Sequence, residues 1–202
     1  MIDYLAVFIF FFSVIDPIGT VPVFIAVTQP FSIKKKRKIA LQATLASGCI
    51  LLFFVIAGEV ILTAIDIPLA AFQVSGGLVL FVFALSMIFG ESKPDEELRM
   101  EKNHTDTAIF PLAVPSIASP GAMLAAVLLT ENNQFSLLEQ ALTATIMISV
   151  LVITYFLMLL AGPIDRLIGN SGASVISRVM GLILASVAVS NVLAGIKEYF
   201  AL

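Results

Sequence analysis

Long apolar stretches separated by short polar connections dominate the chain from end to end. Each stretch runs for about 20 residues with very few charges, which is the length a helix needs to cross a hydrocarbon core about 30 Å thick. Six such stretches are expected to span a membrane, at about 4–28, 39–63, 69–89, 108–130, 140–163 and 174–196. They lack the polar alternation of barrel strands, so we predict that all six are helices.

Composition supports an all-α membrane protein. Hydrophobic residues make up 59% of the 202 residues and charged residues 12%, and the mean hydropathy is +1.06. A chain with so little charge cannot cover a water-soluble surface. The only cysteine, Cys49, lies inside the second predicted span, so we expect no disulfide framework, no metal cluster and no cofactor.

Basic residues gather in the connections that follow the odd-numbered spans. They occupy the run "KKKRK" at 34–38, the loop 91–106, and the segment around Arg166 and Arg178. The positive-inside rule then places these connections in the cytoplasm and both termini outside, where Lys197 is the only basic residue. The run could also be a lipid or nucleic-acid patch, but topology explains it, and we expect membrane lipid and no nucleic acid as partners.

The hydrophilic loop 91–106 divides the chain into two similar halves, 1–90 and 107–202. The windows "ALQAT" at 40–44 and "ALTAT" at 141–145 match at an offset of 101, and the windows 72–87 and 176–191 match at an offset of 104. The second match pairs Gly77 with Gly181 and Ala84 with Ala188. Because each half has three spans, the halves must cross the membrane in opposite senses, which predicts an inverted repeat.

A third match carries the chemistry. "SVIDPIG" at 13–19 lies over "SIASPGA" at 116–122, so that Asp16-Pro17 falls on Ser119-Pro120. Asp and Ser are preferred helix N-caps, and Pro is preferred at the first helical position. Each pair therefore predicts a new half-helix that begins near the middle of span 1 or span 4. A simple kink is the alternative, since Pro with a neighbouring Gly bends membrane helices without any ligand.

Two helix starts that meet at the midplane from opposite sides would form an anion site, because each offers N–H groups and the positive end of its dipole. Gly19, Gly121 and Ala122 would leave room for a ligand to reach the backbone. The predicted substrate-binding residues flank the two breaks: Ile15, Asp16, Pro17, Gly19, Thr20, Ala118, Ser119, Pro120, Gly121 and Ala122.

Three charged residues are candidates for coupling transport to an ion. Asp16 is either a pure cap or a group that also meets a ligand ammonium or carries a proton, since an ionised carboxylate inside a bilayer is costly. Glu59 lies near the outer end of span 2, where it could simply reach the interface. Arg178 either extends to the cytoplasmic interface or recognises a carboxylate. The glycines at 76, 77 and 181 are expected to be packing points rather than site residues.

The motifs in combination resemble those of the MarC family. They are "DPIGTVP" in span 1, "AGE" at 57–59, "SGG" in span 3, "FPLAVPSIASPGA" in span 4 and "RVMGLIL" in span 6. That family includes the SnatA-type transporters, so the resemblance implies transport of small neutral amino acids such as glycine and alanine across a prokaryotic inner membrane. The substrate carboxylate would face residues 17–20 and 120–122, and its ammonium would lie near Asp16 or the carbonyls of Ile15 and Ala118. One half would rock against the other to give alternating access.

Other functions remain open on the residues alone. An intramembrane enzyme is disfavoured, because the spans hold one Asp and the single His, His104, lies in the hydrophilic loop. A proton or cation channel, or an exporter of another small solute, could use Asp16. The sequence decides neither import against export, nor proton against sodium coupling, nor the oligomeric state.

Overall fold

The computed structural model describes residues 3–89, 108–132 and 134–201; within its last helix, the side chains of 164–171, 173–174 and 176–177 are not described. The predicted connecting loop 91–106 and His104 therefore lie outside the described residues. The described chain is helical apart from its turns, as the all-α prediction expected. Its helical segments are α1 (Tyr4–Ile15), α2 (Pro17–Thr28), α3 (Ile33–Ala64), α4 (Leu69–Phe89), η1 (Ala108–Ile117), α6 (Pro120–Leu128), α7 (Leu137–Leu159) and α8 (Ala161–Tyr199).

Five segments of the described chain are long and apolar enough to cross a membrane. They are Tyr4–Thr28, Ile33–Ala64, Leu69–Phe89, Leu137–Leu159 and Arg178–Tyr199. η1 and α6 together make a sixth if they count as one span, although they meet at an angle of 57°. The chain is thus a multi-pass membrane protein with five to six spans, and the predicted number of six is the upper value.

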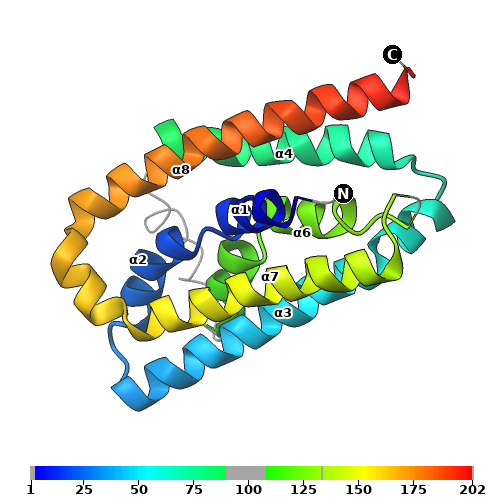
Figure 1. Ribbon diagram of the computed structural model, residues 1–202. Helices are drawn as coiled ribbons and strands as arrows, with labels where there is room; N and C mark the ends of the chain where they lie inside the picture. The colour runs from blue at the N-terminus through cyan, green and yellow to red at the C-terminus, as the bar shows by residue number, and fades with distance from the viewer. Residues whose placement is uncertain (1–2, 90–107, 133, 202) are drawn as a thin grey trace.

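The connection between the predicted spans 5 and 6 is helical. Leu137–Leu159 and Arg178–Tyr199 are separate candidate spans, but α8 already begins at Ala161 and continues through the connection to Tyr199. Pro163 does not prevent this, because it falls in the first turn, where helical N–H groups have no intrahelical partner. Figure 1 shows that α8 instead changes direction before its long final stretch.

The helices form two outer pairs around the interrupted segments. In Figure 1, α4 and α8 run side by side along one edge, and α3 and α7 run side by side along the opposite edge. α1, α2 and α6 lie between these pairs and contact both of them. Both termini, the α3–α4 turn and the α6–α7 loop lie at one end of the molecule, while the α2–α3 turn lies at the other. The two breaks are therefore held in the middle of the bundle.

Glycines bring α4 and α8 to backbone distance. A Cβ on Gly77 would lie 3.0 Å from the carbonyl oxygen of Ala188, and a Cβ on Gly181 would lie 3.0 Å from that of Ala84. A Cβ on Gly76 would lie 2.6 Å from Leu124 of α6. The expectation that these glycines are packing points is therefore confirmed, in keeping with the use of small residues between membrane helices.

The segment η1 is irregular because of its prolines. Phe110 and Val114, which precede Pro111 and Pro115, both have extended backbone angles. The ring of a proline clashes with an α-helical residue before it, so these two positions interrupt the helix. Ser47 of α3 holds the segment by donating a hydrogen bond of 3.3 Å to the carbonyl oxygen of Ala113. This hydrogen bond helps to fix the direction of η1 where it leads into Ser119.

Candidate functional site

The first break consists of one residue, Asp16, which ends α1 and begins α2. Its backbone lies in the left-handed region (φ 50°, ψ 66°), which Asp tolerates better than most residues. Its N–H donates to the carbonyl oxygen of Phe12 at 3.1 Å, and its Oδ1 accepts from the N–H of Gly19 at 3.0 Å. Asp16 therefore caps both helices, and its side chain is only 1% exposed.

The glycine at 19 is explained by the carboxylate of Asp16. A Cβ at this position would lie 2.7 Å from Cγ and 2.9 Å from Oδ1 of Asp16, and it would collide with Oδ2. The expected role of Gly19, to leave room for a ligand, is therefore taken by the cap itself. Gly19 and Asp16 act as one local unit.

The second break joins η1 to α6 through extended backbone at Ser119 (φ −70°, ψ 160°). The Ser119 hydroxyl accepts from the N–H of Ala122 at 3.1 Å, as the capping pattern predicts. The same hydroxyl donates to the carbonyl oxygen of Val14 at 2.7 Å. Val14 belongs to the last turn of α1, where carbonyl groups have no intrahelical donor, so Ser119 satisfies both helix ends at once.

The two breaks are in direct contact. Besides the bond from Ser119 to Val14, the Thr20 hydroxyl lies 3.3 Å from the Ser116 hydroxyl. Thr20 also donates to the carbonyl oxygen of Asp16 at 3.0 Å. The sequence placed both breaks at matching positions, but the contact between them emerges only from the fold. The result is a buried polar centre that joins residues about 100 positions apart.

The two caps already accept hydrogen bonds from most of the backbone N–H groups at the helix starts that we predicted would bind a ligand. Four amides are bound to Asp16 or Ser119, namely those of Gly19, Thr20, Ala122 and Met123. Proline supplies no N–H at the first position of α2 or α6. In the described part of the chain, the amides of Ile18 and Gly121 alone at these two helix starts have no hydrogen-bond partner. The predicted anion site would therefore have only one unbonded N–H from each helix, and its existence stays a prediction.

The other predicted site residues lie around this centre. Ile15, Pro17 and Ala118 are buried, whereas Pro120 is exposed. A Cβ on Gly121 would lie 2.5 Å from Cδ1 of Leu80, so this glycine also accommodates α4. Pro120 is the one place where the predicted site reaches the surface.

Glu59 and Arg178 lie on α3 and α8, apart from the hydrogen bonds that link the breaks. Glu59 is half-buried, and its Oε2 accepts from the N–H of Asn132 at 2.7 Å, which fixes the loop after α6. Arg178 is exposed on α8. Their roles in coupling stay predictions.

Sequence reasoning missed Glu131, a buried acid in the α6–α7 loop. Its side chain is 8% exposed, and burial, followed by the nearby carboxylates of Glu198 and Glu59, raises the pKa of Glu131. The available signal was its place immediately after a span, in a connection without basic residues. Composition alone did not show that α3 and α8 would approach this loop.

Comparison with known proteins places the whole chain in one group. Residues 1–200 match the family described as "MarC family integral membrane protein". A UPF0056 membrane protein of Archaeoglobus fulgidus is 30% identical over 96% of this chain and 92% of its own length. The protein YvbG of Bacillus subtilis is 32% identical over 96% and 94%, and YhcE of Escherichia coli is 30% identical over 98% and 93%, respectively. No solved structure matches. The names of these relatives state membrane location and no activity.

Proposed function

The chain belongs to the MarC family of integral membrane proteins, and from this premise we propose that it is a secondary transporter, not an enzyme, of small neutral amino acids of the glycine and alanine class. The observation that carries the proposal is the contact between two capped helix starts at the buried centre of the bundle. Interrupted helices in matching positions of two halves are the best pointer to a transporter's substrate site.

The chemistry of the centre suits a zwitterion. The amides of Ile18 and Gly121 and the positive ends of α2 and α6 favour a carboxylate. The carboxylate of Asp16 accepts from the N–H of Gly19 at the start of α2. Because it lies at the same helix start, it favours an ammonium group on the same ligand. Ile15, Leu80 and Ile117 are buried beside the breaks, so apolar side chains surround the polar centre, which favours a substrate with a small apolar side chain.

The inverted repeat gains support from the contacts of α4 with α8. Gly77 approaches Ala188, and its counterpart Gly181 approaches Ala84, the counterpart of Ala188. Such reciprocal contacts are what a two-fold axis between the halves would produce. Figure 1 also shows the two helices running in opposite directions. We expect residues 1–90 to superpose on 105–195 about an axis in the membrane plane.

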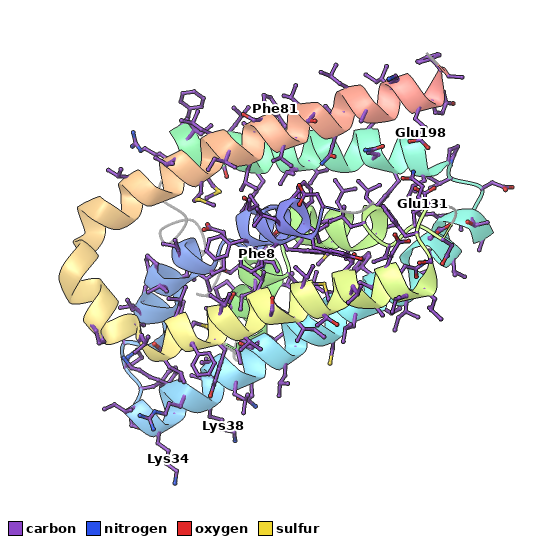
Figure 2. All side chains as sticks on the ribbon, viewed as in Figure 1. Phe8, Lys34, Lys38, Phe81, Glu131 and Glu198 are labelled. Carbon is purple, nitrogen blue, oxygen red and sulfur yellow. The ribbon has the colours of Figure 1, made fainter. Side chains whose placement is uncertain are left out.

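Charge supports an orientation with both termini outside an inner membrane. Figure 2 shows Lys34 and Lys38 at one end of the molecule and Glu131 and Glu198 at the other. The basic end would face the cytoplasm by the positive-inside rule. Alternating access would then expose the centre to the two sides in turn, with Asp16 as the carrier of a coupling proton or sodium ion.

Transport by purified protein in proteoliposomes tests the proposal. We expect saturable counterflow of labelled glycine into vesicles loaded with alanine, and little counterflow into vesicles loaded with glycinamide, which lacks the carboxylate. A channel that uses Asp16 as a filter would instead give flux that does not saturate. Equal counterflow with alanine and with glycinamide would show that the two helix starts are not an anion site.

A further inference from the structure

A polar cavity lies at the end of the molecule that holds both termini, apart from the polar centre between the breaks. Its volume is about 310 Å³, and it is enclosed by residues of α1, α4, α8 and the α6–α7 loop. The lining that matters here comprises Phe10, Gln73, Glu131, Asn191 and Glu198. Figure 2 shows Glu131 and Glu198 close to each other at this end, well away from Lys34 and Lys38 at the start of α3. We call this cavity the outer pocket.

One buried polar group in the outer pocket lacks a partner. Within the described residues, Nδ2 of Asn191 is buried and makes no hydrogen bond. Glu131 lines the same pocket and is 8% exposed, and burial and the nearby carboxylates raise its pKa. Buried polar groups in native proteins are nearly always paired. An unpaired donor that lines a cavity together with a buried acid therefore indicates a ligand.

The field in the outer pocket is negative. Glu198 of α8 lies on one side of Glu131, while Glu59 of α3 and Asp66 of the α3–α4 turn lie on the other. Gln73 of α4 and Phe10 of α1 are uncharged, the pocket lining in the described chain contains no basic residue, and Lys197, the neighbour of Glu198 in α8, is exposed. The described residues contain no group of three acids, histidines or cysteines arranged for a metal ion. An organic cation fits this donor set better than a metal.

We propose that the outer pocket binds the primary ammonium group of a small amine or amino acid between Glu131 and Glu198, with Asn191 Nδ2 donating to an oxygen of the same molecule. Its role as the first binding place of a transported amino acid rests on the transport function proposed above. The central site selects the carboxylate of the substrate. The outer pocket selects its ammonium.

Binding of an ammonium group in the outer pocket should depend on pH. An ammonium needs the ionised form of Glu131, so binding should be lost as the pH falls through the pKa of Glu131. Because burial and two neighbouring carboxylates raise that pKa, the loss should occur at a higher pH than the titration of an exposed Glu would allow. Binding to protonated Glu131 would release one proton.

Glycinamide is the probe, because it carries the ammonium but lacks the carboxylate that the central site requires. We expect saturable binding of labelled glycinamide to the purified full-length protein in equilibrium dialysis, weakened at least about tenfold by Glu131→Gln. The matched control is Glu139→Gln, which removes one charge close to the same loop but outside the pocket. Glu139 accepts from Ser136 in a capping box that Gln also supports, so its replacement should leave binding unchanged.

A second variant covers failure of Glu131→Gln to fold. Glu198 is exposed, so Glu198→Gln should fold and should weaken glycinamide binding as well. Equal binding by the parent and the folded pocket variants, or an equal loss in Glu139→Gln, would overturn the proposal. The two proposals fail separately: glycine counterflow without glycinamide binding removes the outer pocket only, whereas Glu131-dependent glycinamide binding without glycine counterflow removes the transport function only.

Discussion

The break at Asp16-Pro17 and the break at Ser119-Pro120 occupy matching places in the two halves but use oxygen atoms of different character. An ionised carboxylate can only accept hydrogen bonds, whereas a hydroxyl both accepts and donates. The carboxylate of Asp16 thus caps α2 alone. The hydroxyl of Ser119 caps α6 and also donates to the carbonyl oxygen of Val14 in α1. The first break supplies a charge, and the second supplies the bond that holds the two breaks together.

The backbone differs in the same sense. Asp16 takes the left-handed conformation and links α1 to α2 through a single residue, while Ser119 is extended and follows an irregular segment. Position 19 must be glycine because the longer Asp side chain lies over it, whereas Ala122, the equivalent position, already carries a Cβ. The two breaks share the geometry of an interrupted helix, but the first supplies the charge and the second supplies the hydrogen bond between them.

Removing the charge of the first break should have the largest effect on function. Asn tolerates the left-handed conformation and can still accept from Gly19, so Asp16→Asn should fold and lose gradient-driven accumulation of substrate while keeping some counterflow. Uptake with and without an imposed gradient is the measurement. Asp3→Asn is the matched control, because Asp3 is exposed, lies outside the outer pocket and caps the start of α1, which Asn can also do, so it should lose nothing. Full accumulation by the Asp16 variant would reduce Asp16 to a cap.

Closing the space over Asp16 should have the next effect, on stability. Gly19→Ala places a methyl group on the carboxylate and should lower the free energy of unfolding by about 1–3 kcal/mol, the range for overpacked sites. The opposite change at the equivalent position, Ala122→Gly, should cost only about 0.5–1 kcal/mol through helix propensity. Unfolding midpoints of the purified proteins compare them. Similar losses at both positions would contradict the difference described between the breaks.

Removing the hydrogen bond from Ser119 to Val14, which joins the two breaks, should have the smallest effect. Ser119→Ala loses the cap on Ala122 and leaves the carbonyl of Val14 without its donor, a cost of about 1–2 kcal/mol in unfolding free energy. Ser75→Ala is the control, because the exposed Ser75 bonds only within α4, and its loss should stay within about 0.5 kcal/mol. An equal, small change in both variants would mean that the bond between the breaks contributes little.

The breaks could be predicted from the sequence because capping is local. Asp16 and Ser119 each bind an N–H three residues ahead, so a four-residue motif contains all the participants. The contact of Ser119 with Val14 spans 105 positions and depends on how α1 and α6 pack, which no motif records. The continuous α8 was missed for a related reason. Hydropathy indicates where a span leaves the lipid. A helix can continue beyond that point as long as its backbone hydrogen bonds are formed, as α8 does.

The interlocked glycines of α4 and α8 bear on the mechanics of any conformational change. These two helices come from different halves of the sequence, yet they form the most extensive contact between helices of the described chain. At Gly77 and Gly181 the backbones of the two helices touch, because glycine has no side chain to separate them. Packed surfaces of this kind have discrete arrangements and do not deform continuously. α4 and α8 should therefore travel as one rigid body, and the hinges should lie at the interrupted helices. The moving parts of this protein would then each combine helices from both halves of the proposed inverted repeat.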